Sequence, residues 1–134
     1  LDTNILVYSF DEDAPQKQQT AQHLIKTALS SQQGIISSQV VQEFLNVAQR
    51  RFKKPMSVAD ARVYLNTVLR PLCQHFPSLG FYEKALLLRE ETDYGLYDSL
   101  IVMAAIEASC KFVISEDLQD GRIIQGVRIL NPFS

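Results

Sequence analysis

Apolar residues recur three and four positions apart along much of the chain, a spacing that predicts amphipathic helices. Ala21, Leu24, Ile25 and Ala28 show this spacing within one stretch. The stretch from Leu100 to Ser109 is apolar at almost every position, which is typical of a buried helix. The predicted helices cover residues 5–10, 16–31, 39–51, 57–69, 78–92 and 97–109.

Short apolar runs lie between these helices and predict strands. Residues 35–37, 111–115 and 127–130 are predicted as strands, and residues 71–76 as a weaker one. Leu1 is expected to end a first strand that is truncated at the N-terminus of this sequence. Short strands that alternate with helices indicate a parallel sheet covered on both faces. We therefore expect a single α/β domain over residues 1–134, a three-layer α/β/α sandwich with a short central parallel sheet.

The composition agrees with one globular domain. The 134 residues are 46% hydrophobic and 21% charged, and two cysteines are too few for a disulfide scaffold. The longest apolar run is far too short to cross a membrane. The two cysteines are 37 residues apart without CxxC spacing, so we expect reduced thiols in a cytoplasmic protein. The net charge of -2 argues against a protein that holds nucleic acid by bulk positive charge.

Four acidic residues fall where a parallel sheet places a ligand, outside the carboxyl ends of its strands. Asp2 follows the expected first strand, and Asp117 follows the strand 111–115. Asp98 begins the helix that leads into that strand. Glu43 has helical spacing from neighbouring valines and therefore shares the stripe expected to face the core. We expect the four acids to meet at one rim of the sheet.

Each acid also has a purely structural explanation. Asp98 could cap its helix, and Asp2 and Asp117 could belong to turns. Glu43 is harder to explain, because an unpaired buried carboxylate costs several kcal/mol. Two carboxylates about 4 Å apart repel by roughly 4 kcal/mol at an effective dielectric constant near 20, so a cluster needs protonation or a cation. Carboxylate oxygens without His or Cys suit Mg²⁺ or Mn²⁺ rather than zinc.

Four motifs, in order along the chain, give it a resemblance to the PIN domain ribonucleases. They are Asp2-Thr3-Asn4, Glu43 within Val-Val-Gln-Glu-Phe, Tyr97-Asp98-Ser99-Leu100, and Ser115-Glu116-Asp117. The resemblance covers essentially the whole chain. Within that family the sequence looks like the VapC-type toxins of bacterial toxin–antitoxin pairs.

This resemblance implies Mg²⁺- or Mn²⁺-dependent hydrolysis of RNA phosphodiester bonds. The metal would be held by four catalytic acids, Asp2, Glu43, Asp98 and Asp117. Asn4 would orient the first of these acids, and Ser115 would take a position that such domains fill with Thr or Ser. The resemblance also implies a cognate antitoxin protein as partner and a homodimer. The apolar face of the helix 57–69 is a candidate for the dimer contact, and packing in the core of the domain explains this face equally well.

One basic run stands out at the end of the helix that carries Glu43. It consists of Arg50, Arg51, Lys53 and Lys54. These side chains could complement the dipole of the helix C-terminus and aid solubility, or they could contact RNA phosphates. If four of the 15 acids hold metal, 13 basic residues face only 11 other acids. The acidity is then concentrated in the metal pocket, and we expect weak, metal-dependent and salt-sensitive RNA binding.

Other classes of protein remain as alternatives. Haloacid dehalogenase-like phosphatases also place an Asp after the first strand, but they want a second Asp where this chain has Asn4. Receiver domains expect paired acids at that strand. A catalytically silent PIN module would serve as a binding scaffold, and the presence of all four acids argues against it.

Overall fold

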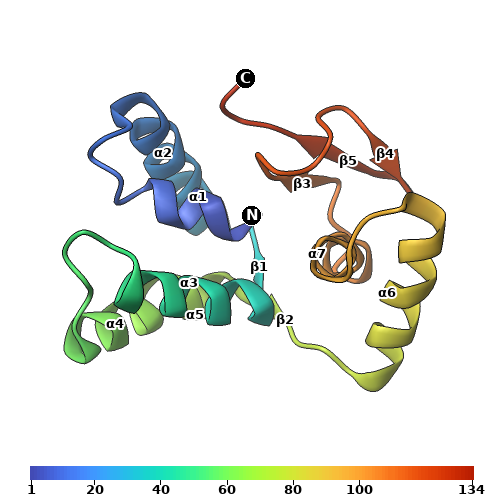
Figure 1. Cartoon of the computed structure of the whole chain (residues 1–134), viewed down its shortest axis with the longest axis horizontal. Coiled ribbons are helices and arrows are strands. Elements are labelled where there is room, and N and C mark those ends of the chain that lie inside the picture. Colours follow the sequence, from blue (N-terminus) through green and yellow to red (C-terminus); the bar gives the residue numbers. More distant parts are fainter. The chain divides into compact units, whose positions relative to one another are not determined.

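A computed structural model describes residues 1–134, and its backbone divides into two units, residues 1–74 and 75–134. In Figure 1 the first unit runs from blue to green and the second from yellow to red. None of the helices combines the length and the apolar character that a membrane crossing demands.

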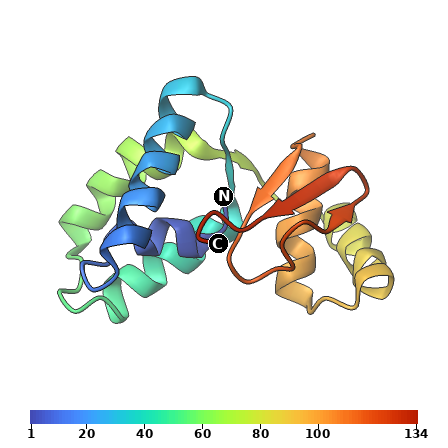
Figure 2. The same ribbon diagram turned by 90° about the horizontal axis from the view of Figure 1, so that it is seen from above.

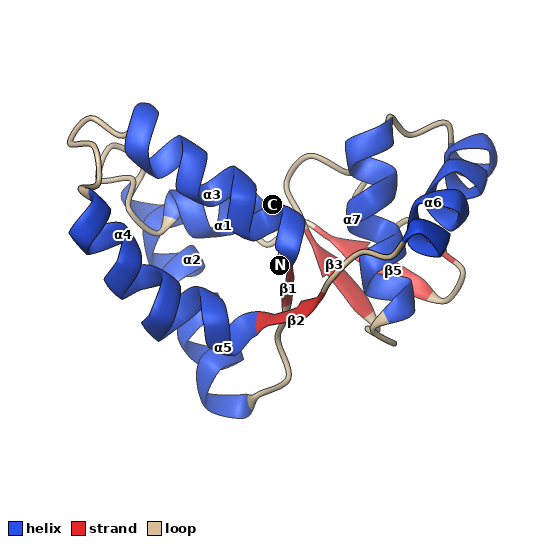
Figure 3. Cartoon of the chain, turned by 90° about the horizontal axis from the view of Figure 1, so that it is seen from below, coloured by secondary structure: helices blue, strands red, loops and turns tan.

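The first unit is mostly helical (Figure 3). Its elements are α1 (Thr3–Tyr8), α2 (Pro15–Ser31), β1 (Ile36–Ser37), α3 (Ser38–Arg50), α4 (Val58–Tyr64), the π-helix η1 (Leu65–Leu69), α5 (Arg70–Leu72) and β2 (Cys73–His75). The last residue of β2, His75, belongs to the second unit. Helix α1 packs against both α2 and α3, and the short strands β1 and β2 pair with each other. Ile5, Leu6 and Phe44 are fully buried in this unit. The predicted helices and the strand 35–37 are therefore confirmed here, with ends shifted by one or two residues.

The helix predicted over 57–69 begins as expected and continues beyond its predicted end. The Ser57 hydroxyl accepts a hydrogen bond from the backbone N–H of Asp60 at 3.1 Å, which caps α4. The backbone N–H of Arg70 donates to the carbonyl of Leu65, five residues earlier, and Pro71 follows. Because proline has no N–H and its ring crowds the preceding turn, a wider π-turn lets the helix pass through this residue. The weak strand predicted over 71–76 is therefore shortened to β2.

The second unit combines two helices with a three-stranded sheet. Its elements are α6 (Leu79–Thr92), α7 (Leu96–Glu107), β3 (Phe112–Ile114), β4 (Ile123–Ile124) and β5 (Val127–Leu130). Strand β5 lies in the middle, parallel to β3 with Val113 opposite Ile129, and antiparallel to β4. Figure 2 shows the hairpin of β4 and β5 in red. Helix α7 packs against β3 and β5 on one side and α6 on the other.

The burial of α7 explains its composition. Every residue from Ser99 to Ala105 is buried, because the sheet and α6 together cover the helix on more than one side. A parallel strand pair packed against such a helix confirms the α/β class. Strand β4 was not predicted. It depends on a hairpin turn in which Gln125 and Gly126 both have positive φ, and a Gln-Gly pair is a weaker signal than Asn-Gly.

Candidate metal centre

Asp2 lies at the start of α1 and is buried. Its Oδ1 accepts a hydrogen bond from the backbone N–H of Thr3 at 2.7 Å, so the carboxylate caps the helix. The backbone nitrogen of Leu1 donates to the carbonyl of Ile35 at 2.8 Å, which places the residue before Asp2 beside the residue before β1. Asn4 is half-buried in the first turn of the same helix. The structure thus shows Asp2 as a helix cap, and its role as a metal ligand stays a prediction.

Glu43 lies in the middle of α3, and its predicted burial is wrong. The buried stripe of this helix consists of Val40, Phe44 and Ala48, whereas Glu43 is exposed. Its Oε1 accepts a hydrogen bond from Nε2 of Gln39, one turn earlier, at 2.7 Å. The cost of a buried carboxylate therefore gives no support to a metal role for Glu43. Ser37 occupies the cap position of this helix.

Asp98 lies in the first turn of α7, as predicted, and is half-buried. The cap position belongs to Gly95, so Asp98 does not act as the cap residue. Its charge still complements the positive end of the helix dipole. The next residue, Ser99, is completely buried.

Asp117 follows β3 in an exposed loop, at the carboxyl end of that strand as predicted. Its backbone N–H donates to the hydroxyl of Ser115 at 3.1 Å. Ser115 is completely buried, and its own N–H donates to the carbonyl of Leu130 at 3.0 Å. Ser115 therefore fixes the start of the loop that carries Asp117. Nearby, Oδ1 of Asp120 accepts from the backbone N–H of Asn131 at 2.9 Å, which is a turn-stabilising role.

The four predicted acids are divided equally between the two units. Asp2 and Glu43 belong to residues 1–74, and Asp98 and Asp117 belong to residues 75–134. No group of three or more His, Cys, Asp or Glu side chains forms a metal site within either unit. The assignment of these four acids to one metal centre therefore stays a prediction.

A buried hydroxyl without a hydrogen-bond partner follows one predicted acid in each unit. The hydroxyls of Thr3 and Ser99 are buried and have no hydrogen-bond partner. Thr3 follows Asp2 directly, and Ser99 follows Asp98. A buried hydroxyl without a partner costs about 1–3 kcal/mol, which a ligand or an ordered water can recover. With only carboxylate and hydroxyl oxygens as donors, Mg²⁺ or Mn²⁺ suits these residues better than zinc.

A comparison with models of known protein families finds a match. The family model described as PIN domain matches residues 1–120, a range that contains all four predicted acids. The chain belongs to the PIN domain family. PIN domains are generally nucleases and typically use a divalent metal, so this membership supports a hydrolase of nuclease type and favours it over the phosphatase alternative. A search of curated proteins finds no match to this PIN domain.

The basic run at the end of α3 has acidic neighbours within its own unit. Lys53 forms an ion pair with Asp13, and the carboxylates of Asp13, Asp11 and Glu12 raise the pKa of the Lys53 ammonium. Arg50 lies in the last turn of α3, where its charge complements the helix dipole. The structural explanation therefore accounts for Arg50 and Lys53, while Arg51 and Lys54 are exposed.

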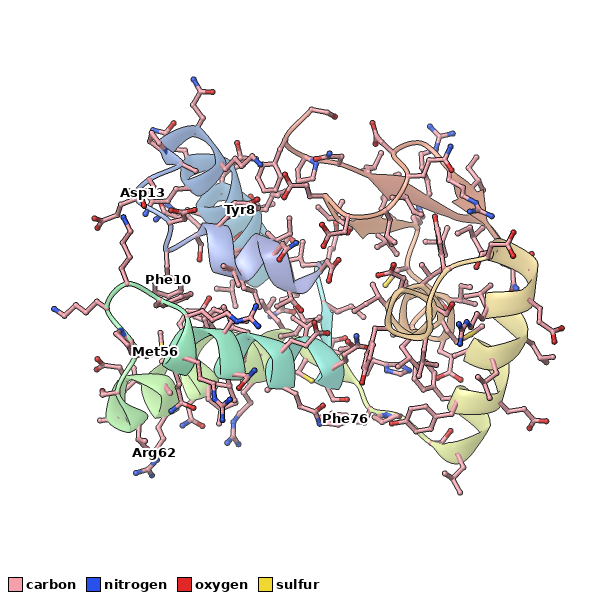
Figure 4. All side chains as sticks on the ribbon, in the orientation of Figure 1. Tyr8, Phe10, Asp13, Met56, Arg62 and Phe76 are labelled. Carbon is pink, nitrogen blue, oxygen red and sulfur yellow. The ribbon has the colours of Figure 1, made fainter.

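The same end of the first unit has an open hollow of about 430 Å³. Phe10 and Met56 line it (Figure 4), together with Phe52, Tyr64 and Lys54. The rings of Phe10, Phe52 and Tyr64 form one aromatic cluster with the buried Phe44, and the closest centroids lie 4.9 Å apart. None of the four predicted acids lines this hollow.

Two polar contacts in the second unit were missed by sequence reasoning. His75 is buried, and its Nε2 lies 2.8 Å from Oε1 of Glu107. The guanidinium of Arg122 donates a hydrogen bond to the carbonyl of Thr92. Each pair is at least 30 residues apart in sequence, so no local pattern could have revealed it.

Proposed function

We propose that this PIN domain is an Mg²⁺- or Mn²⁺-dependent endoribonuclease and that it acts as the toxin of a toxin–antitoxin pair. The observation that carries the proposal is the family match over residues 1–120, because this range includes Asp2, Glu43, Asp98 and Asp117. The unpartnered buried hydroxyls of Thr3 and Ser99, next to two of these acids, support it.

The four acids would hold the metal, and Asp2, Asp98 and Asp117 each have a distinct local support. Asp2 keeps one carboxylate oxygen on the N–H of Thr3, which fixes the orientation of the group. Asp98 is held by the rigid first turn of α7, and Asp117 by the Ser115 hydroxyl. When bound, a divalent ion supplies the positive charge that polarises a phosphodiester and makes water a stronger acid. The residues themselves orient the carboxylates and supply negative charge, and none of them needs to act as a covalent nucleophile.

RNA cleavage by matched variants tests this proposal. The purified protein is incubated with a panel of structured and single-stranded RNAs, with Mn²⁺ or with a chelator. We expect cleavage with Mn²⁺ alone, and a loss of roughly 100-fold or more in Asp98→Asn, because removal of a metal-binding charge removes most of the metal-dependent rate. Asp60→Asn is the matched control, since Asp60 is also an acid in the first turn of a helix. Equal cleavage by Asp98→Asn and the wild type would overturn the site.

Asp2→Asn separates charge from helix capping. The amide oxygen of asparagine can still accept the N–H of Thr3, so α1 keeps its cap while the negative charge is lost. We expect an unfolding temperature close to that of the wild type together with a loss of cleavage. A variant that unfolds easily would show instead that Asp2 serves the fold.

Metal binding can be measured without any RNA. If the four carboxylates repel one another, a divalent cation should stabilise the folded protein, by about 1.4 kcal/mol at ten times its dissociation constant. A rise in the unfolding temperature with millimolar Mn²⁺, absent in Asp98→Asn, supports the site. A silent PIN module would show no metal-dependent cleavage in the RNA assay.

The toxin role and the partners are tested in cells and in solution. Induced expression should arrest growth, the Asp98→Asn variant should not, and co-expression of the adjacent open reading frame should restore growth if it encodes the antitoxin. A homodimer should double the mass in light scattering. Val58 of α4 lies on the apolar face of the helix 57–69 and is exposed, so it is the residue to replace in a test of the proposed dimer contact.

A further inference from the structure

The side chain of Arg122 joins two connecting segments of the second unit. Its Nη1 donates to the carbonyl oxygen of Thr92 at 3.2 Å, and its guanidinium carbon lies 4.8 Å from the ring centre of Tyr94. Thr92 and Tyr94 lie at the end of α6 and in the connection to α7. Arg122 itself ends the loop that follows β3 and carries Asp117.

The backbone around Arg122 is tied to the sheet. The N–H of Arg122 donates to the carbonyl of Gln119 at 3.2 Å, and the carbonyl of Arg122 accepts from the N–H of Ile129 at 2.9 Å. The N–H of Gly121 donates to the carbonyl of Ile129 at 2.8 Å. The far end of the Asp117 loop is thus fixed to β5, just as Ser115 fixes its near end.

The segment that Arg122 contacts, residues 92–95, is also held by hydrogen bonds and leads directly to the helix turn that carries Asp98. Thr92 is buried, its hydroxyl donates to the carbonyl of Leu88 at 2.9 Å, and it accepts from the N–H of Tyr94 at 3.2 Å. Gly95 then caps α7, whose first turn holds Asp98. A displacement of Thr92 or Tyr94 would therefore be passed to Asp98 through a few constrained residues.

Arginine is well suited to this position. The carbonyl of Thr92 belongs to the last turn of α6, where helix carbonyls have no partner within the helix and attract positive charge. The planar guanidinium can bond to that carbonyl while it stacks on an aromatic ring. Its half-buried position protects both contacts from solvent.

We propose that Arg122 is a positioning residue that locks the Asp117 loop to the segment preceding Asp98 and so sets the spacing of these two acids for metal binding. The metal part rests on the proposed function. The locking part rests on the contacts of Arg122 alone. Gln125 adds a weaker tie, since its Nε2 donates to Oε2 of Glu91 at 3.0 Å on the exposed surface.

Hydrogen exchange tests the lock without reference to activity. In Arg122→Ala, amide exchange should become faster both in residues 115–121 and in residues 92–98. The control Arg128→Ala removes the same charge from an exposed position on β5 and should leave both segments unchanged. Faster exchange confined to the residues around position 122, or equal exchange in the two variants, would overturn the proposal. If Arg122→Ala does not fold, Tyr94→Leu provides the same comparison, because it removes the ring under the guanidinium.

The Mn²⁺ concentration at half-maximal stabilisation tests the metal part. We expect Arg122→Ala to raise this concentration roughly 10-fold, as loss of a residue that orients ligands does, with kcat at saturating Mn²⁺ near that of the wild type. Arg122→Lys should recover part of the loss, since an ammonium can reach the same carbonyl but cannot stack as a plane. An unchanged concentration in Arg122→Ala would overturn the metal part. If the wild type neither binds Mn²⁺ nor cleaves RNA, the proposed function and the metal part both fail, and the exchange result alone decides the lock.

Discussion

Nε2 of His75 lies 2.8 Å from Oε1 of Glu107, a contact that joins the end of β2 to the last turn of α7. The imidazole is buried and its ring centre lies 4.6 Å from that of Phe81. Lys84 approaches the other carboxylate oxygen of Glu107 at 3.4 Å. The hydrogen bond with His75, assisted by Lys84, holds the pKa of Glu107 below its ordinary value.

This contact predicts a specific loss of stability in acid. A carboxylate whose pKa is depressed in the fold stabilises the protein above its ordinary pKa and loses that contribution as the pH falls through the folded value. We expect the free energy of unfolding to fall between about pH 5 and pH 3, and Glu107→Gln to fall less steeply. Urea unfolding at a series of pH values measures this, with the exposed Glu83→Gln as control. Parallel curves for Glu107→Gln and the wild type would contradict the prediction.

Tyr64 predicts the behaviour at high pH. Burial raises the pKa of its phenol to about 12, although a hydrogen bond with Ser9 opposes the shift. Because the unfolded phenol ionises near pH 10 and the folded one does not, stability should decline above about pH 10, by at most about 1.4 kcal/mol per pH unit. Tyr64→Phe should remove this decline, and an ultraviolet titration should show one fewer late-ionising tyrosine.

Gly34 predicts a steric effect in the connection before β1. A Cβ at this position would clash with Cβ of Ala28, and both atoms belong to groups without a flexible end. Gly34→Ala should therefore destabilise the fold by roughly 1–3 kcal/mol, as overpacking does. Gly95 is the matched control, since a Cβ there meets nothing within 4 Å and its φ is -65°. Thermal unfolding compares the two variants, and equal unfolding temperatures would count against the contact.

Phe44 predicts how strongly the aromatic cluster holds the first unit together. Its ring is fully buried, with centroids 4.9 Å from Tyr64 and 5.9 Å from Phe10. Phe44→Ala should cost about 3–5 kcal/mol, the usual loss for a buried phenylalanine. Phe76→Ala replaces the same residue type at a position that is 71% exposed and should change stability by less than about 0.5 kcal/mol. Denaturant unfolding measures both, and similar losses would mean that Phe44 is not a central core residue.

A substitution of Glu43 should affect RNA cleavage without affecting stability. Because the side chain is exposed, Glu43→Gln should change the free energy of unfolding by less than about 0.5 kcal/mol. If Glu43 belongs to the proposed metal centre, the same variant should nevertheless lose Mn²⁺-dependent RNA cleavage. Unfolding and cleavage are measured on one preparation, with Gln42→Glu as an exposed control on the same helix. A stable variant with full activity would remove Glu43 from the site.

The helices and the placement of most acids could be predicted because they depend on local pattern. Ser57 and Ser78 cap helices as their positions suggest, and Asp98 opens a buried helix. Glu43 was misplaced because it lies at the edge of the stripe. Successive residues of a helix are rotated by about 100° around its axis. Phe44 and Ala48 therefore lie to one side of Val40 and Glu43 lies to the other, so the buried face turns away from Glu43.

The contacts between distant segments could not be predicted in the same way. His75 meets Glu107, and Arg122 meets Thr92, only because strands and helices far apart in sequence pack together. The hairpin of β4 and β5 was missed because Gln125 adopts a positive φ that its residue type rarely signals. Local sequence patterns could therefore predict candidate metal ligands. The contacts of His75 and Arg122 could be found only in the folded chain.

The pairing of Ser115 with Leu130 has a consequence for how this PIN domain may be shortened. The family match ends at residue 120, yet both ends of the Asp117 loop are fastened to β5, and Asp120 accepts from the backbone of Asn131. A fragment cut at the limit of the family match would keep all four acids and lose the strand against which one of them is aligned. The residues that match the family model are thus fewer than the residues needed to hold the Asp117 loop in place.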